Sequence, residues 1–187
     1  MVGTKNAHKV LELQRILEGL IPGLVLEPSP EDSPVEDGDT FSANALIKAR
    51  AAFGSTGRPA IADDSGLEVR WLQGKPGIFS ARYAESGVDA DNTAKVLSEM
   101  AGVEDRAAAF VCAAALVHEG GEVVIEKRWE GSLAQEPAGS GGFGYDPVFI
   151  PDGYLVTSAE LTAEEKDSLS HRGQAFRALA PALAALG

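Results

Sequence analysis

The strongest constraint on the fold comes from two extended segments, 107–117 and 122–129, on either side of Glu119-Gly120-Gly121. Two strand-like runs separated by a short glycine-containing turn predict a β-hairpin. The chain must therefore contain a sheet.

The rest of the chain alternates between helical and extended apolar spacing. Val10, Leu13, Leu17 and Leu20 form a helical stripe after the polar loop 4–9. We expect further helices at 42–53, at 89–100, after the capping box at Thr162, and at 172–186. We expect short strands at 24–26, 59–62 and 148–150. Residues 67–72 should be extended, and residues 28–39 should form a loop. Helices that alternate with strands, followed by a hairpin, predict one α/β domain with a mixed sheet over residues 1–187.

Charge and composition exclude several classes of function. The formal net charge of -12 argues against a nucleic-acid polymer as partner, because neutralising its phosphates requires a basic face. A small polyphosphate remains compatible with the positive residues, which cluster as Lys5, His8 and Lys9 and as Lys166, His171 and Arg172. No apolar run reaches the ~20 residues of a membrane helix. The single cysteine, Cys112, fits a buried thiol in a reducing cytoplasm.

Two polar segments are candidates for phosphate and metal chemistry. The loop 4–9, between a very short strand and a helix start, would direct backbone N–H groups at an anion, with Lys9 and Asn6 as further donors. A plain helix-capping loop is the alternative. Asp63-Asp64-Ser65-Gly66 ends an apolar strand, where carboxylates need compensation by a cation or by hydrogen bonds. One or two carboxylates satisfy Mg²⁺, and the acidic segment 36–39 could supply the second; an acidic surface turn is the alternative.

The segment Gly141-Gly142-Phe143-Gly144-Tyr145-Asp146-Pro147 is a candidate base-binding loop. Glycines let the backbone approach a ligand, and an aromatic ring offers a stacking surface for a nucleobase. Residues 139–144 also match Gly-x-Gly-x-x-Gly, but that dinucleotide fingerprint requires a helix after it. Here a proline and a predicted strand follow, so a dinucleotide-binding fold is excluded.

Several motifs together resemble the inosine triphosphate pyrophosphatase family. They occur in the family's order along essentially the whole chain: Thr4-x-Asn6-x-x-Lys9-x-x-Glu12, Thr40-Phe41-x-x-Asn44-Ala45, Ala62-Asp63-Asp64-Ser65-Gly66-Leu67, Pro76-Gly77-Ile78-Phe79-Ser80-Ala81-Arg82-Tyr83, Gly142-Phe143-Gly144-Tyr145-Asp146-Pro147, Ala159-Glu160-Leu161-x-x-Glu164-x-Lys166 and Ser168-x-Ser170-His171-Arg172-Gly173. The resemblance implies an elongated α/β fold of two lobes with a nucleotide cleft between them. It also implies a Mg²⁺-dependent homodimeric hydrolase that converts ITP, dITP and XTP to the monophosphate and pyrophosphate.

The resemblance also implies roles for individual residues. The triphosphate would lie on the loop formed by Thr4, Lys5, Asn6, Ala7, His8 and Lys9. Asp64 would be the general base and a metal ligand, with Ser65 beside the substrate and Glu36 as the second ligand; Asp37 remains an alternative to Glu36. Phe143 would stack on the base in a pocket lined by Gly144, Tyr145 and Asp146, and Lys166, His171 and Arg172 would face the purine edge.

Three other functions stay open from the sequence. A related pyrophosphatase acting on other bases would keep the phosphate machinery and change the base pocket. A non-catalytic nucleotide-binding protein would keep the pocket without needing Asp63, Asp64 and Glu36, which are all present. A structural interaction domain would leave the carboxylate and cation clusters without a purpose.

Overall fold

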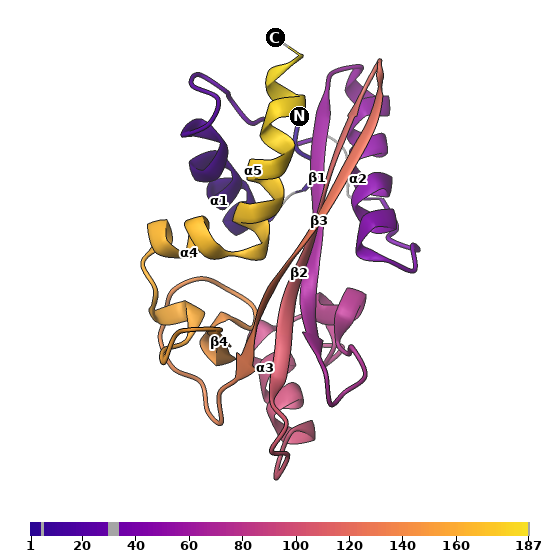
Figure 1. The fold of residues 1–187 in the computed structure, drawn as a ribbon. Helices are drawn as coiled ribbons and strands as arrows, with labels where there is room; N and C mark the ends of the chain where they lie inside the picture. The colour runs from indigo at the N-terminus through magenta and orange to yellow at the C-terminus, as the bar shows by residue number, and fades with distance from the viewer. Residues whose placement is uncertain (5, 30–33, 187) are drawn as a thin grey trace. The chain divides into compact units, whose positions relative to one another are not determined.

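The computed structural model describes residues 1–4, 6–29 and 34–186. The helices are α1 (Ala7–Glu18), α2 (Phe41–Thr56), α3 (Asp89–Glu99), α4 (Ala163–Leu169) and α5 (His171–Ala184). The strands are β1 (Ala60–Val69), β2 (Ala107–His118), β3 (Gly121–Leu133) and β4 (Phe149–Pro151), and the short 3-10 helices are η1 (Gly77–Arg82), η2 (Asp146–Val148) and η3 (Ser158–Glu160). The strands form one sheet in the order β1-β2-β3-β4 (Figure 1), so the α/β class with the predicted hairpin is confirmed.

The chain divides into two compact units. Unit 1 comprises residues 1–64, 112–127 and 171–187, and unit 2 comprises residues 65–111 and 128–170. Each unit has its own hydrophobic core, and all twelve buried members of one core and all eleven of the other fall within a single unit.

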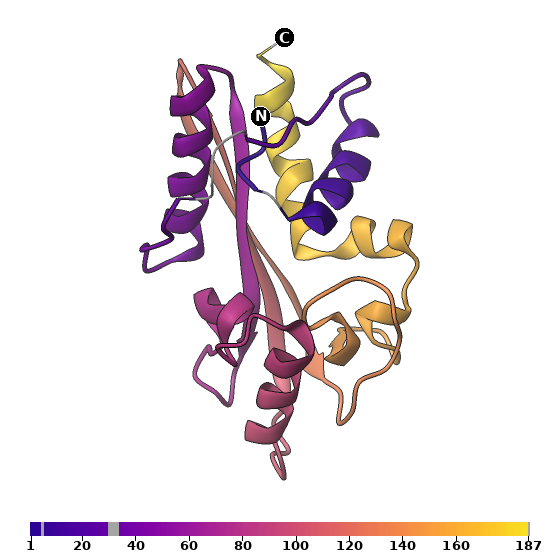
Figure 2. The same ribbon diagram turned by 180° about the vertical axis from the view of Figure 1, so that it is seen from behind.

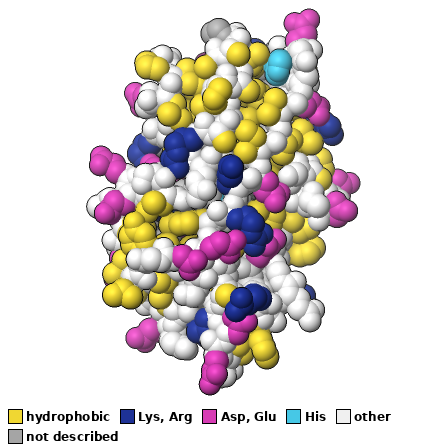
Figure 3. Space-filling view, in the orientation of Figure 1, with side chains coloured by type: hydrophobic (Ala, Val, Ile, Leu, Met, Phe, Trp, Pro, Cys, Tyr) yellow, Lys and Arg dark blue, Asp and Glu magenta, His cyan; other side chains and the backbone are white. Residues whose placement is uncertain are grey.

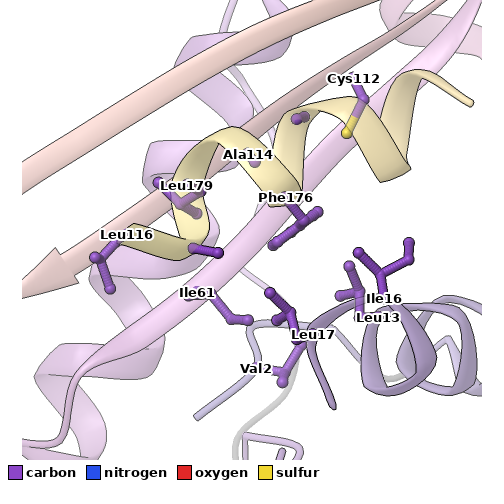
Figure 4. Packing of buried hydrophobic residues seen from close by; sticks show 12 residues of the cluster. Val2, Leu13, Ile16, Leu17, Ile61, Cys112, Ala114, Leu116, Phe176 and Leu179 are labelled. Atoms are coloured by element: carbon purple, nitrogen blue, oxygen red, sulfur yellow. The ribbon is translucent and has the colours of Figure 1, made fainter. Parts of the chain in front are cut away.

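The core of unit 1 is built by α1 and α5 against β1 and β2. Figure 4 shows Phe176 of α5 pointing toward Leu13 and Leu17 of α1, with Ile61 of β1 beside them. All four side chains are at most 2% exposed, and the helical spacing of the leucines is the one the sequence predicts. In both ribbon views α2 lies on the opposite side of β1 from α1 and α5 (Figure 2).

The core of unit 2 is an aromatic cluster under the paired ends of β3 and β4. The rings of Phe110 and Phe149 lie 4.5 Å apart, and those of Trp129 and Phe149 lie 5.3 Å apart, in tilted geometry. β3 and β4 are antiparallel, with Gly131 opposite Pro151. A side chain at Gly131 would collide with the carbonyl of Ile150, so this close strand pairing requires glycine there.

Two predicted elements are wrong. No strand forms at 24–26, because the side-chain amide of Gln14 satisfies this backbone: it donates to the Leu24 carbonyl at 3.0 Å and accepts from the Leu26 N–H at 3.2 Å. β1 also does not end at Asp63 but continues through the acidic segment to Val69. Asp63 and Asp64 are 1% and 7% exposed, so the alternative of an acidic surface turn is excluded as well.

Among the described residues, no helix has both the length and the apolar character that crossing a membrane requires. On the face drawn in Figure 3, lysine and arginine side chains are interspersed with acidic ones.

Candidate active site

The N-terminus of α1 forms the predicted polar loop. Asn6 caps the helix, its Oδ1 accepting from the Lys9 N–H at 3.2 Å, and Thr4 Oγ1 accepts from the Asn6 N–H at 3.2 Å. His8 is exposed on the first turn. Lys5 lies outside the described residues, and of Ala7 only its place at the first position of the helix is described. The capped helix end presents the N–H groups and positive dipole that suit a phosphate.

Asp63 binds the cations that reach it from α1 and α5. Its Oδ2 accepts from Lys9 Nζ at 3.1 Å and from Arg172 Nε and Nη2 at 3.3 and 3.1 Å. Burial alone would raise the pKa of Asp63, but attraction by Lys9, Arg172 and Lys48 outweighs it and holds the pKa far below its ordinary value. Asp63 is therefore an ionised counterion within unit 1.

Arg172 is deeply buried in the same cluster. Besides its bonds to Asp63, its Nη1 donates to Glu12 Oε2 at 2.5 Å, and the residue is 2% exposed. Burial lowers its pKa, yet Asp63 and Glu12 raise the pKa by more, so the guanidinium stays charged. The sequence resemblance implies a place at the purine edge for Arg172; in this structure its guanidinium is bound by two carboxylates, and the base-edge role stays a prediction.

Asp64 faces α2 instead, as strand alternation requires. Its Oδ1 accepts from Lys48 Nζ at 3.0 Å and its Oδ2 from Asn44 Nδ2 at 3.2 Å. Lys48 Nζ also lies 3.2 Å from Glu36 Oε2, so one ammonium group links the two carboxylates predicted as metal ligands. Burial opposes the charge on Lys48, but Asp64, Asp63 and Glu36 raise its pKa overall.

Lys48 is a site residue that sequence reasoning missed, and Asn44 was noted only as part of a family motif, without a role. They lie four residues apart on α2, so both project from one helical face toward Asp64. The signal was present in the predicted helix at 42–53, where an asparagine and a lysine at this spacing interrupt a segment of small and apolar residues. Asn44 is 1% exposed and Lys48 is 5% exposed, and burial this complete is unusual for such side chains without a specific partner.

The carboxylate pair fits a magnesium ion that also binds substrate oxygens. In the described part of the chain, no three His, Cys, Asp or Glu side chains gather into a metal-binding group. Mg²⁺ is commonly held by one or two carboxylates together with substrate phosphates and water, and such a site needs no third protein ligand. Asp64 and Glu36 carry two negative charges against the single charge of Lys48, leaving an excess that a cation can offset.

The candidate base-binding loop belongs to unit 2 and is organised by Asp146. This residue is 2% exposed; its Oδ2 accepts from the Phe143 N–H at 2.8 Å and from Lys166 Nζ at 2.5 Å, and its Oδ1 accepts from Ser158 Oγ at 2.8 Å. Lys166 Nζ also lies over the Phe143 ring, 5.3 Å from its centroid. The structure thus brings Phe143, Asp146 and Lys166 together, and their roles in base binding stay predictions.

Three other predicted residues have structural settings of their own. Tyr145 is buried in unit 2, and its hydroxyl donates to the Ser80 carbonyl at 2.8 Å. Ser65 is partly exposed on β1 directly after Asp64, and His171 is 5% exposed at the first position of α5 in unit 1. Their contacts with a nucleotide stay predictions.

Comparisons with known proteins show the family to which the chain belongs. The family model described as the Ham1 family matches residues 1–182. The protein from Mycobacterium tuberculosis named dITP/XTP pyrophosphatase is 50% identical over 194 residues, covering 100% of this chain and 95% of the relative. The similarly named protein of Corynebacterium efficiens is 50% identical, covering 100% of this chain and 97% of that relative.

Solved structures give the same result. A Ham1 protein from Coxiella burnetii superposes with a TM-score of 0.87 at 41% identity, covering 97% of this chain and 96% of that chain. A structure titled nucleoside-triphosphatase / dITP/XTP pyrophosphatase from Mycobacterium abscessus has a TM-score of 0.76 at 50% identity, covering 96% and 97% of the two chains. The family resemblance seen in the motifs is confirmed over the whole length, and the chain belongs to the Ham1 family.

Proposed function

We propose that this protein hydrolyses purine nucleoside triphosphates such as ITP, dITP and XTP to the monophosphate and pyrophosphate. The observation that carries the proposal is the buried carboxylate Asp64, joined to Glu36 through Lys48, in a chain half identical to proteins named dITP/XTP pyrophosphatase. Removing such triphosphates keeps altered bases out of the nucleotide pool. We place this reaction in the cytoplasm, where the single cysteine stays reduced, and expect a homodimer as the family resemblance implies.

Unit 1 would bind the triphosphate. The N-terminus of α1 offers backbone donors and Lys9 an ammonium group, and these groups would stabilise the negative charge of the departing pyrophosphate. Lys9 is already held by Asp63 at 3.1 Å, so its position is fixed before substrate arrives. A lysine that need not be ordered on binding costs less conformational entropy.

Asp64 would act as the general base toward the water that attacks the α-phosphorus. An aligned base contributes about 10²–10⁴ in rate. Lys48 and Asn44 hold the Asp64 carboxylate through one oxygen each, which fixes its orientation. Asp64 and Glu36 would hold Mg²⁺, which offsets charge on the phosphate oxygens when bound.

Unit 2 would bind the base. The Phe143 ring provides a stacking face that accepts any base, so selection must come from groups at the base edge. A 6-oxo purine presents an acceptor where adenine presents an amine donor, and Lys166 can only donate. The proposed site therefore favours ITP and XTP over ATP, with the further edge contacts of His171 and Arg172 as the family resemblance implies.

The test is pyrophosphate release from a panel of ITP, dITP, XTP, GTP and ATP, with Mg²⁺ and with excess EDTA. We expect turnover of ITP and XTP well above that of ATP, lost in EDTA and greatest at alkaline pH, where the triphosphate is fully ionised and binds the metal. Turnover led by another base would favour the related pyrophosphatase. Nucleotide binding without turnover would favour a non-catalytic binding protein. If the protein neither bound nor hydrolysed any of these nucleotides, only a structural role would remain.

A further inference from the structure

The backbone on both sides of the Phe143 ring is held by carboxylates. The Phe143 N–H donates to Asp146 Oδ2 at 2.8 Å, within the loop itself. The next N–H, that of Gly144, donates to Asp89 Oδ2 at 2.7 Å, and Asp89 begins α3, 55 residues earlier in the chain. Hydrogen bonds to an ionised acceptor are about twice as strong as those between neutral groups. Two such bonds on successive peptides fix the direction in which Phe143 leaves the backbone.

A second contact from α3 reaches the same residue. Thr93 Oγ1 donates to the Gly144 carbonyl at 3.4 Å, and Asp89 and Thr93 lie four residues apart on one helical face. α3 thus contacts both the N–H and the C=O of Gly144. Gly144 has a φ of 62°, a left-handed conformation that favours glycine, so the hydrogen bonds act on a backbone able to adopt other conformations.

A cavity beside the glycine loop makes the position of the loop more dependent on these hydrogen bonds. A cavity of about 710 Å³ lies between α3 and the glycine loop, and its walls include Asp89, Thr93, Leu97, Gly142, Phe143 and Gly144. Open space also surrounds the position that a Cβ on Gly144 would take. A segment that borders a cavity loses packing contacts on that side, so its position depends more on directed hydrogen bonds.

α3 is itself a firm support for the loop. Asn92 accepts from the Ala84 N–H at 2.7 Å and donates to the Ala81 carbonyl at 3.2 Å. Val96, on the same face of α3 as Asp89 and Thr93, and Met100, which caps the C-terminus of the helix, are completely buried in the core of unit 2. Asp89 is therefore attached to a helix that is anchored independently of the loop.

We propose that Asp89 is a positioning residue for base binding, acting through the Gly144 peptide on the Phe143 ring. The proposal rests on the proposed function in one respect, the role of Phe143 as the stacking face. Loss of the Asp89 bond would let the ring leave its binding orientation, which weakens substrate binding without touching the reacting atoms. Because stacking is tolerant of base identity, ITP and ATP would be affected by the same factor.

The test compares Asp89→Ala with a matched control on the same helix turn. Asp91 is also an acidic residue in the first turn of α3 and is exposed, so Asp91→Ala removes a similar interaction with the helix dipole. We expect Asp89→Ala to raise KM for ITP and for ATP by about tenfold, with kcat within about twofold, and Asp91→Ala to leave both unchanged. Asp89→Asn keeps an acceptor oxygen and should restore most of the loss.

A second readout needs no activity. In NMR spectra of the nucleotide-free protein, the Gly144 amide resonance should shift in Asp89→Ala and stay in place in Asp91→Ala. An unmoved Gly144 resonance, a loss confined to kcat, or an equal KM change in the Asp91 variant would each overturn the proposal. Absence of pyrophosphate release from the wild type would contradict the proposed function instead; the affinity for ITP with Mg²⁺, measured by calorimetry, then replaces KM in the comparison.

Discussion

Asp63 and Asp64 are adjacent in sequence and have different partners. Asp63 lies among Lys9 and Arg172 and is the counterion of the α1–α5 side, whereas Asp64 binds Asn44 and Lys48 of α2. The alternation of a strand predicts that only one carboxylate enters the site. The structure adds that the other also has a defined electrostatic task.

Replacing each aspartate by asparagine should separate the two roles. Asp64→Asn removes the proposed base and should lower kcat at least about 100-fold. Its cost in stability is moderate, because Lys48 keeps Glu36 as a partner. Asp63→Asn should lower kcat less and cost about 3 kcal/mol or more in unfolding free energy, because Arg172 and Lys9 lose a buried counterion. Steady-state kinetics and urea unfolding measure both; equal, small losses of kcat would show that the base is assigned wrongly.

The pH dependence of stability gives a second test of Asp63. Its pKa in the folded protein lies far below the ordinary value of 3.8, so the unfolded chain takes up this proton first as pH falls. The ionised group therefore contributes stability above pH 3.8, and the contribution is lost as the pH falls below that value. Urea midpoints followed from about pH 5 to pH 2 should decline more steeply for the wild type than for Asp63→Asn. Asp152→Asn, at an exposed carboxyl, should follow the wild type; a parallel decline in Asp63→Asn would contradict the assignment.

At the scale of elements, the sequence predicts most helices and the hairpin within a few residues. The helix predicted at 89–100 is α3 (Asp89–Glu99), and the capping box at Thr162 opens α4, with Thr162 Oγ1 accepting from the Glu165 N–H at 3.2 Å. The features that the sequence does not predict depend on contacts between residues distant in the chain. A periodic pattern cannot show that Gln14 will bind the backbone at 24–26, or that Lys48 will stand between Asp64 and Glu36.

The glycine loop offers a prediction at this scale. Gly142 has a φ of 71°, and a Cβ there would collide with Asp146 Oδ2 and lie 3.0 Å from Lys166 Nζ. Gly153 has a φ of 83° with open space at its Cβ position, so an alanine there meets only the backbone strain. We expect Gly153→Ala to cost about 1–2 kcal/mol of unfolding free energy and Gly142→Ala about 3 kcal/mol or more, with a raised KM for ITP. If urea unfolding gave the same loss of unfolding free energy for both variants, the loop would be able to rearrange around the added methyl group, and the position of Asp146 would not depend on glycine at 142.

At the scale of the whole molecule, the two units divide the proposed work. Unit 1 contains Asp64, Glu36, Lys48 and the start of α1, which suit a triphosphate with its metal, and unit 2 contains Phe143, Asp146 and Lys166, which suit a base. The family membership was predictable from ordered motifs over the whole chain, while the nucleotide cleft between lobes and the homodimer remain predictions.

The most direct measurement of the central claim is the fate of the water oxygen. The wild type and Asp64→Asn would each hydrolyse ITP with Mg²⁺ in H₂¹⁸O. The products would then be separated, and mass spectrometry would show which of them contains ¹⁸O. We predict IMP and pyrophosphate as products, with the label in the IMP phosphate, and a rate at least about 100-fold lower for Asp64→Asn. Label in the pyrophosphate, release of orthophosphate as the first product, or an undiminished rate in Asp64→Asn would contradict the account.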